Sequence, residues 1–288
     1  MTRAILVGYG RAGRRHGATL DRLGIEWDYY DPYVSIGDAY YRKGGFISQN
    51  PANCLEVAIK IKYAFAIIAT PPSLHLSQIQ ACLNVGLPVL CEKPLCALGQ
   101  LGEAEAMLEH PLSHRVMMAQ NYRFHPTLVA IKRSQELWEQ LGGQWACFSD
   151  QHRTDIPEWG LLLDHVSHSV DILLWLSGME TLEVSRATHS SNASMETWFA
   201  DGSMGSHSFN IWECVRTDMV NKKAWVSGPF GNVEVATSQP VAEQMMDAMY
   251  KVFLAHLTGN EGFPVGLEAG VRVQRVLEEA VRVANERE

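Results

Sequence analysis

The fold is decided by the stretch Arg3-Ala4-Ile5-Leu6-Val7-Gly8-Tyr9-Gly10-Arg11-Ala12-Gly13. The apolar run that ends at Val7 predicts a buried strand, and residues 11–23 predict a helix. Between them, glycines spaced as G-x-G-x-x-G predict a tight turn that suits the pyrophosphate of a dinucleotide. The weaker alternative is a glycine-rich turn that binds nothing.

Each residue of this turn has a physical role in a dinucleotide site. Gly8 permits the tight turn, Gly10 lets the backbone approach a pyrophosphate, and Gly13 allows close helix–strand packing. The helix that starts at Arg11 and Ala12 offers N–H groups and a partial positive charge to the phosphates. The basic cluster of this helix either assists the phosphates or, slightly favoured, forms a solvated face; it comprises Arg11, Arg14, Arg15 and His16.

An acidic residue, Asp31, stands at the end of the next predicted strand, residues 25–30. Its carboxylate is placed to accept hydrogen bonds from the adenosine ribose hydroxyls. It would repel a 2′-phosphate, and neither Pro32 nor Tyr33 supplies a compensating cation. The sequence therefore predicts NAD as the cofactor, with NADP less favoured.

Strands and helices alternate along the first part of the chain. After the second strand we predict strands over 63–69, 88–91 and 115–119 and helices over 73–85 and 98–109. This alternation implies a parallel, doubly wound sheet. We therefore expect residues 1–120 to form an α/β dinucleotide-binding Rossmann domain.

The pattern changes near Gln120. From there we predict helices over 127–141, 161–176, 242–257 and 266–285, and strands over 182–187, 196–199, 203–212, 224–226 and 232–235. Turn residues such as Asp201-Gly202 separate some of the strands. We therefore expect residues 121–288 to form an α+β substrate-binding and oligomerisation domain with an open, largely antiparallel sheet.

Composition limits the class of protein. The 288 residues are 47% hydrophobic and 19% charged, which suits a globular chain with a sizeable core. A net charge of −8 argues against nucleic acid as a partner. No apolar run has the length of a membrane span, and a strand at the very start predicts that there is no signal peptide. Six cysteines without a CxxC pair favour a reduced, cytoplasmic protein.

Two further motifs follow predicted strands, at the sheet edge where ligands bind in open α/β folds. The backbone of Thr70-Pro71-Pro72 is placed to line the cofactor, and His75 either reaches the cofactor or lies on the helix surface. In Glu92-Lys93-Pro94 the lysine can polarise a substrate hydroxyl, while Glu92 holds the cofactor or the lysine. Pro94 would fix the turn, with a cis bond as one option. An exposed charged turn is the equally weighted alternative.

A third group lies on the apolar helix predicted over 161–176. Asp164, His168 and Asp171 recur at i, i+4 and i+7 and so share one face, whereas His165 is expected to point elsewhere. Buried ionisable groups cost free energy unless paired, so these residues form a structural network or a site. A histidine is a natural acid/base for alcohol oxidation, and a nearby aspartate can orient it. A metal site built from Asp164, His165 and His168, with His152, is less favoured, and we expect no metal.

With these residues in hand, the chain resembles the glucose–fructose oxidoreductase / inositol dehydrogenase (Gfo/Idh/MocA) family nearly end to end. The resemblance is carried by the glycine turn, Ala69-Thr70-Pro71-Pro72 with His75, Glu92-Lys93-Pro94, Asn121-Tyr122-Arg123-Phe124-His125-Pro126, Asp164, His168, Asp171 and the C-terminal helix after Phe263-Pro264. Two features depart from the family pattern. Val166 stands where glycine is usual, and the short second domain is consistent with loss of a strand pair found in longer relatives.

The resemblance implies a lysine–aspartate–histidine site, matched by Lys93, Asp164 and His168. It also implies that Asn121 lies near the nicotinamide and Arg123 near the substrate. The open sheet of the second domain often makes a dimer interface in this family, so we expect a homo-oligomer, a dimer or a tetramer.

The motifs together predict an NAD-dependent dehydrogenase that acts on a secondary alcohol of a sugar, cyclitol or sugar derivative. His168 would take the hydroxyl proton, Lys93 would polarise the oxygen, and Asp164 would position the substrate or the histidine. The candidate substrate contacts are Arg123, His152, Arg153 and Trp159. Two alternatives stay open: a redox-neutral NAD-dependent glycosidase or lyase, and a non-catalytic NAD-binding sensor.

Overall fold

The computed structural model describes residues 2–31, 45–46, 63–133, 144–152, 160, 162–191, 195–204, 207–216, 223–228, 231–235, 238–257, 259 and 261–286. Contacts divide the chain into two compact units. The first unit comprises Met1–Cys96, Gly102–Ala119 and Met246–Gly270, and the second comprises Ala97–Leu101, Gln120–Met245 and Val271–Glu288. Among the described residues, no helix combines the length and the apolar character needed to cross a membrane.

The first unit is built on a six-stranded sheet in the order β3-β2-β1-β4-β5-β6, with every pairing parallel. The strands are β1 (Arg3–Val7), β2 (Glu26–Tyr30), β3 (Gly45–Phe46), β4 (Phe65–Ile68), β5 (Val89–Cys91) and β6 (Val116–Met118). The strand order reverses between β1 and β4, and ligands bind beyond the carboxyl ends of the strands at such a switch point. The predicted doubly wound Rossmann sheet is confirmed.

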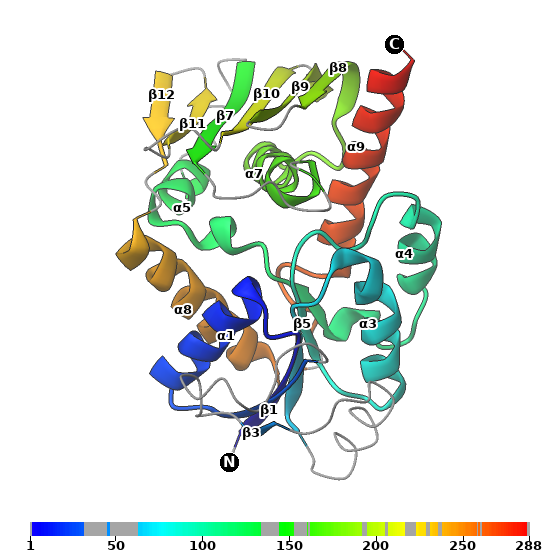
Figure 1. The fold of residues 1–288 in the computed structure, drawn as a ribbon, viewed down its shortest axis with the longest axis vertical. Coiled ribbons are helices and arrows are strands. Elements are labelled where there is room, and N and C mark those ends of the chain that lie inside the picture. Colours follow the sequence, from blue (N-terminus) through cyan, green and yellow to red (C-terminus); the bar gives the residue numbers. More distant parts are fainter. Residues whose placement is uncertain are drawn as a thin grey trace. The chain divides into compact units, whose positions relative to one another are not determined.

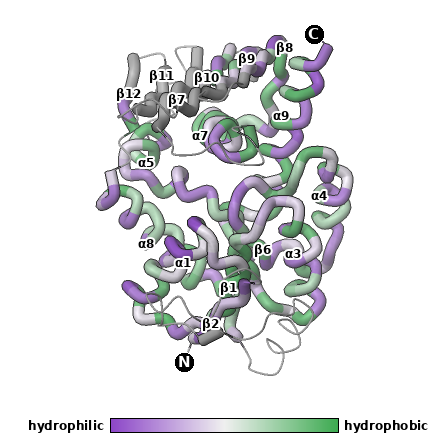
Figure 2. Tube along the Cα trace, viewed as in Figure 1, coloured by the Kyte–Doolittle hydropathy of each residue, from purple (hydrophilic) through white to green (hydrophobic). Residues whose placement is uncertain are grey.

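Short helices connect these strands. They are α1 (Arg11–Arg22), η2 (Pro72–Leu74), α3 (His75–Asn84), α4 (Leu101–Met107) and η3 (Ser113–Arg115). Strands β4, β5 and β6 are fully buried, and Figure 2 shows hydrophobic colouring at β6, whose three residues have no exposed surface. Strands covered on both faces have continuous apolar sequences, which is why the sequence predicted these three, whereas the two-residue strand β3 was not predicted.

A segment from the C-terminal part of the chain completes the first unit. The backbone N–H of Met118 donates to the carbonyl of Val265 at 2.8 Å, beside an isolated bridge between Met117 and Gly266. Phe253, on helix α8 (Gln239–His256), packs edge-on against Phe65, with ring centroids 5.1 Å apart. These contacts join residues about 150 positions or more apart, and no local sequence pattern predicted them.

The second unit contains a six-stranded sheet in the order β12-β11-β7-β10-β9-β8. Its strands are β7 (Gln144–His152), β8 (Glu183–Ser191), β9 (Met195–Met204), β10 (His207–Arg216), β11 (Lys223–Gly228) and β12 (Gly231–Glu234). Four pairings are antiparallel, and β7 pairs with β10 in parallel. The predicted largely antiparallel sheet is confirmed, although β7 was not predicted.

One predicted turn in this sheet is wrong. Asp201-Gly202 lies inside β9, whereas the sequence predicted that one strand ends before this pair and another begins at Ser203. A Cβ atom on Gly202 would stand 1.8 Å from the carbonyl oxygen of Glu183 on the neighbouring strand, close to an irregularity between Val184 and Arg186. The glycine therefore serves a close backbone approach rather than a chain reversal.

Helices cover one face of this second sheet (Figure 1). They include η4 (Asn121–Phe124), α5 (Pro126–Arg133), the π-helical turn η5 (Leu162–Val166), α7 (Ser167–Ser177) and most of α9 (Leu267–Asn285). Leu173 and Leu176 of α7 pack with Phe209 of β10 and Leu277 of α9 in one buried cluster. Figure 2 shows hydrophobic and hydrophilic residues alternating along α9, as expected for a helix with one face on the core.

Candidate cofactor and active site

The glycine turn between β1 and α1 has the geometry that a pyrophosphate needs. Gly8 has a φ of +92°, and a Cβ atom there would stand 2.6 Å from the carbonyl oxygen of Ala69. A Cβ atom on Gly13 would stand 2.0 Å from the carbonyl oxygen of Gly8, whereas one on Gly10 would meet nothing within 4 Å. Gly8 and Gly13 are therefore required for backbone packing, and the space beside Gly10 is open to a ligand.

Helix α1 presents its amino end to this space. Gly10 is the N-cap residue, no side chain caps the helix, and its first turn contains no acidic residue. Backbone N–H groups and the positive end of the helix dipole thus remain to interact with an anion. Arg11, Ala12 and the glycines lie together here, as the sequence predicted, and this donor set fits the phosphates of a dinucleotide.

Asp31 follows β2 at the same edge of the sheet. Its Oδ2 accepts the backbone N–H of Tyr9 at 2.6 Å, and the N–H of Gly8 donates to the carbonyl of Tyr30 at 2.8 Å. The side chain of Asp31 is buried against the glycine turn. The carboxylate thus ties the turn to β2 at the position where the family motif places its ribose contact.

His16 corrects the interpretation of the basic cluster. Arg11, Arg14 and Arg15 are exposed, as a solvated helix face requires, but His16 has no exposed surface. Its Nδ1 lies 2.7 Å from the hydroxyl of Tyr250 and its Nε2 lies 3.0 Å from Oε1 of Glu92. Hydrogen bonds to both ring nitrogens allow the imidazole to be buried.

His75 is also buried, which excludes the helix-surface alternative. Its Nδ1 lies 2.8 Å from the carbonyl oxygen of Pro94, and its Nε2 lies 2.8 Å from the carbonyl oxygen of Thr70. Burial lowers the pKa of His75, although its backbone hydrogen bonds oppose that effect. The imidazole therefore joins the Thr70-Pro71 turn after β4 to the lysine turn after β5.

The Glu92-Lys93-Pro94 turn follows β5 and contains a cis bond between Lys93 and Pro94, the option that the sequence had left open. The N–H of Lys93 donates to Oε2 of Glu92 at 3.2 Å. Burial alone would raise the pKa of Glu92, but the hydrogen bond from His16 and the electrostatic effects of His16, Arg15 and Lys93 hold it at about 2. Glu92 is therefore an ionised carboxylate fixed beside the lysine.

In the second unit, η4, η5 and α7 bring the candidate residues Asp164 and His168 close to Tyr122 and His165. The ring of Tyr122 packs edge-on against that of His168, with centroids 4.7 Å apart, and the ring of His165 lies 6.4 Å from His168. Nε2 of His165 lies 3.6 Å from Oδ2 of Asp164, contrary to the expectation that His165 points elsewhere. That expectation assumed α-helical spacing, whereas these residues occupy a π-helical turn, a feature frequent at functional sites.

Arg123 and Asp171 form a buried ion pair beside this group. Nε of Arg123 lies 3.1 and 3.0 Å from the two carboxylate oxygens, and Nη2 lies 2.6 Å from Oδ1. Burial raises the pKa of Asp171, and the charge and hydrogen bonds of Arg123 oppose this rise. The guanidinium predicted to lie near the substrate is thus bound to Asp171, the second acidic residue of the predicted helix face.

Asn121 supplies a further polar atom. Its Oδ1 is buried and has no hydrogen-bond partner within the part of the chain that the structure describes. A buried amide oxygen normally accepts a hydrogen bond, so a donor from a ligand would satisfy it.

The other predicted substrate contacts lie at or beyond the limits of the described residues. His152 ends β7, but its side chain lies outside the described residues, and Arg153 and Trp159 lie outside them entirely. Among the described residues, no group of three His, Cys, Asp or Glu side chains could hold a metal ion.

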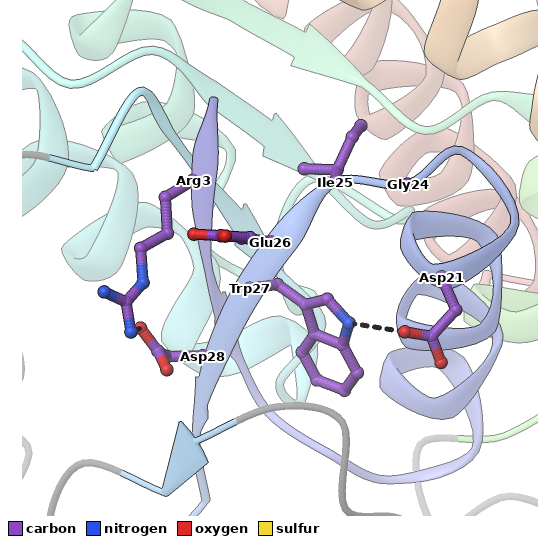
Figure 3. Close-up of a pocket in the computed structure, with 7 residues that line it drawn as sticks. All are labelled: Arg3, Asp21, Gly24, Ile25, Glu26, Trp27 and Asp28. Atoms are coloured by element: carbon purple, nitrogen blue, oxygen red, sulfur yellow. Dashed lines mark hydrogen bonds and ion pairs between the residues drawn. The ribbon is translucent and has the colours of Figure 1, made fainter. Parts of the chain in front are cut away.

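A pocket of about 520 Å³ lies at the opposite edge of the first sheet (Figure 3). Its lining residues are Arg3, Asp21, Gly24, Ile25, Glu26, Trp27 and Asp28. Arg3 and Glu26 start the paired strands β1 and β2, so the pocket is at the amino ends of the strands. An ion pair between Arg3 and Asp28 at 2.6 Å occupies one wall, and the indole of Trp27 donates to Asp21 on the other. The pocket is therefore separate from the glycine turn.

The fold defines the class of protein: a Rossmann unit followed by an α+β unit in which ionisable residues of η5 and α7 lie close together. Residues 2–122 match the Gfo/Idh/MocA family model, described as "Oxidoreductase family, NAD-binding Rossmann fold". These residues belong to that oxidoreductase family, as the sequence resemblance predicted.

Curated relatives include two proteins named inositol 2-dehydrogenase 2. The one from Saccharopolyspora erythraea is 26% identical over 163 residues, which cover 54% of this chain and 46% of the relative. The one from Mycolicibacterium vanbaalenii is 32% identical over 127 residues, covering 41% and 36%. The matched part of this chain thus spans less than half the length of these relatives.

Solved structures share the fold over almost the whole chain. A myo-inositol dehydrogenase from Corynebacterium glutamicum superposes with a TM-score of 0.80 at 18% identity, covering 99% of this chain and 97% of the other. A scyllo-inositol dehydrogenase from Lactobacillus casei, solved with NAD(H) and scyllo-inositol, gives a TM-score of 0.80 at 14% identity, covering 100% and 98%. At these identities the likeness shows the two-unit architecture.

Proposed function

We propose that this protein is an NAD-dependent dehydrogenase that oxidises a secondary alcohol of a cyclitol, sugar or sugar derivative, or catalyses the reverse reduction. The observation that carries this proposal is the position of Lys93. The lysine follows β5, and the glycine turn follows β1, at the carboxyl edge of one parallel sheet. The family of residues 2–122 and the names of similar proteins support the reaction class.

In this proposal the glycine turn holds the pyrophosphate and Asp31 binds the adenosine ribose. NAD, when bound, supplies the hydride acceptor for the alcohol carbon. Asp31 also sets the preference for NAD, because its negative charge disfavours a 2′-phosphate. The buried Oδ1 of Asn121 is a suitable acceptor for a hydrogen-bond donor of the nicotinamide end of the cofactor.

We assign proton transfer and oxygen polarisation to two different residues. Lys93 donates a hydrogen bond to the reacting oxygen and stabilises its negative charge, because the fixed Glu92 carboxylate favours a protonated neighbour. His168 takes the hydroxyl proton, and Asp164 orients the substrate or the histidines beside it. Arg123, His152, Arg153 and Trp159 stay candidate substrate contacts, and Arg123 would act there while paired to Asp171.

The test is the formation of NADH, followed by its near-ultraviolet absorbance, with NAD and a panel of inositols, sugars and sugar acids. NADP is run in parallel. Turnover with NAD and a polyol supports the proposal. NAD binding confirmed by thermal shift, with no NADH formed across the panel, would contradict it and favour a redox-neutral glycosidase or lyase, or a sensor.

We also propose a cytoplasmic homo-oligomer, a dimer or a tetramer, that uses the face of the second sheet opposite to α7. On this sheet the guanidinium of Arg186 lies 4.8 Å above the ring of Phe199 and pairs with Asp201 at 2.7 Å. Cys82, Cys91 and Cys96 are buried free thiols, which fits a reducing compartment. Light scattering on the purified protein tests the assembly, and a monomeric mass would contradict it.

A further inference from the structure

We propose that Tyr250 and His16 are positioning residues that hold the Glu92 carboxylate against the Lys93 turn. The proposal rests on the proposed function in one respect, the assignment of the reacting oxygen to Lys93. The sequence placed His16 in the basic cluster of α1, as a phosphate contact or part of a solvated face, and made no prediction for Tyr250, which lies in α8, more than 150 residues after the lysine.

The geometry is a continuous chain of hydrogen bonds. The hydroxyl of Tyr250 lies 2.7 Å from Nδ1 of His16, and Nε2 of His16 lies 3.0 Å from Oε1 of Glu92. The second carboxylate oxygen, Oε2, accepts the backbone N–H of Lys93 at 3.2 Å. Both oxygens of Glu92 are thus fixed, one by the imidazole and one by the lysine turn itself.

Burial shows that this chain positions other groups and does not contact substrate. His16 and Tyr250 have no exposed surface, and Glu92 is 9% exposed. Polar groups removed from water cost free energy unless each finds a partner, so the three side chains depend on one another. Tyr250 therefore acts on the lysine through His16 and Glu92.

The protons shared along this chain of hydrogen bonds can be assigned from Glu92 at one end and Tyr250 at the other. The low pKa of Glu92 keeps the carboxylate ionised, so Nε2 of His16 must carry the shared hydrogen. Burial raises the pKa of Tyr250 well above its ordinary value, so the phenol keeps its proton. That hydroxyl therefore has a proton to donate to Nδ1 of His16. The chain of hydrogen bonds thus keeps the negative charge of Glu92 beside Lys93.

Contacts around Tyr250 hold it in place relative to α1. Arg22 of α1 donates to Asp247 of α8 at 2.7 Å, so two turns of α1 contact the same part of α8 (Figure 1). Further along α8, Phe253 stacks on Phe263 with centroids 4.9 Å apart. These contacts hold the part of α8 that contains Tyr250.

The first experiment compares Tyr250→Phe with Tyr63→Phe, a matched control. Tyr63 is also buried, and its hydroxyl donates to a carboxylate, Asp28, at 2.8 Å, at the amino ends of the strands. We expect Tyr250→Phe to lower kcat by about fivefold to tenfold, as loss of one hydrogen bond allows. We expect KM and the Kd for NAD to stay within about twofold, because the substituted hydroxyl contacts neither ligand. Tyr63→Phe should leave kcat unchanged.

A second pair of variants separates positioning from general packing. His16→Gln keeps an N–H donor for Glu92 and should retain more kcat than His16→Leu, which keeps none. In a Glu92→Gln background, Tyr250→Phe should lower kcat no further, because the hydroxyl acts through the carboxylate. Equal effects of Tyr250→Phe in both backgrounds would overturn the proposal.

A third measurement does not depend on turnover. The rate at which Lys93 is acetylated by a small anhydride, measured by peptide mass spectrometry, reports the surroundings of its amine. We expect this rate to rise by about threefold in Tyr250→Phe and to stay unchanged in Tyr63→Phe. If the wild-type protein turns over no substrate, the proposed function fails while this comparison still decides the positioning role. An unchanged Lys93 rate in folded Tyr250→Phe or, should that variant not fold, in His16→Leu would overturn the inference.

Discussion

The guanidinium of Arg123 binds the carboxylate of Asp171 through two nitrogens, with a shortest distance of 2.6 Å, and both side chains are largely buried. Arg123 belongs to η4, directly after the first sheet ends, and Asp171 belongs to α7. The pair therefore joins the segment that contains Asn121 and Tyr122 to the helix that contains His168.

Arg123→Met should destabilise the protein by about 3–5 kcal/mol at neutral pH, because it leaves a buried carboxylate without its cation. The double variant Arg123→Met/Asp171→Leu should recover most of this loss. Burial already raises the pKa of Asp171, and loss of Arg123 should raise it further. A raised carboxyl pKa contributes stability at low pH that is lost as pH rises through the folded-state value. Urea unfolding should therefore show a larger difference from wild type at about pH 7 than at about pH 4, and an equal difference would contradict this explanation.

The three glycines of the turn should respond differently to alanine. Gly13→Ala should cost at least about 2 kcal/mol, because its Cβ would stand 2.0 Å from the Gly8 carbonyl oxygen. Gly10→Ala should change stability by less than about 0.5 kcal/mol, since nothing lies within 4 Å of the added methyl. It should nevertheless weaken NAD binding by about tenfold or more, because the methyl occupies the pyrophosphate approach. Gly102→Ala, which also meets open space, is the control for both measurements. Unchanged NAD affinity in Gly10→Ala would contradict the assignment of this space.

Asp31→Asn should lower the preference for NAD over NADP by about tenfold. Asparagine keeps an oxygen that can accept the N–H of Tyr9, so the glycine turn should survive while the negative charge is removed. Isothermal titration with both cofactors measures the ratio, and a thermal melt checks the fold. The same ratio as in wild type would show that another residue selects the cofactor.

Lys93→Met should abolish turnover, with kcat lower by about a hundredfold or more, and leave the Kd for NAD close to wild type. Methionine keeps most of the side-chain volume and removes the charge that would stabilise the substrate oxygen. Lys251→Met, at an exposed position of α8, is the matched control and should be fully active. Normal activity of Lys93→Met would remove the lysine from the mechanism.

Acid should weaken the protein partly through Glu92. The pKa of this carboxyl falls from 4.5 to about 2 in the folded chain. A lowered carboxyl pKa contributes stability that is present above the unfolded value and lost as pH falls through the folded one. The contribution is on the order of 3 kcal/mol and should disappear between about pH 4.5 and pH 2. Glu92→Gln should be less stable than wild type at about pH 7, and the difference should shrink across that window. A constant difference would show that the surroundings of Glu92 do not lower its pKa.

Sequence reasoning located the elements whose signals are local. The apolar runs around Val7, Ile68 and Cys91 marked strands of a sheet covered on both faces, and the glycine spacing marked the turn. Strand β7 was not predicted, because its neighbours β10 and β11 lie more than 50 residues away in the sequence and no hairpin turn adjoins it.

The sequence indicated which residue types belong to the site, but it did not predict which of them are buried or what they contact. Arg14-Arg15-His16 resembles a solvated helix face, yet His16 lies three residues after Gly13 and four before Leu20, both buried. That 3.6-residue spacing was the available signal that His16 faces inward. The partner that makes its burial possible, Tyr250, is 234 residues away, and no local rule could have paired them.

The return of Met246–Gly270 to the first unit bears on how this protein can be dissected. A fragment ending near residue 122, where the family match stops, would contain every strand of the first sheet and the whole glycine turn. It would lack the phenol that His16 contacts, the ring that packs on Phe65 and the carbonyl that receives the N–H of Met118. Such a fragment would expose apolar surface and unpaired polar groups that the intact chain covers, so we expect it to be less stable than the same residues in the intact chain.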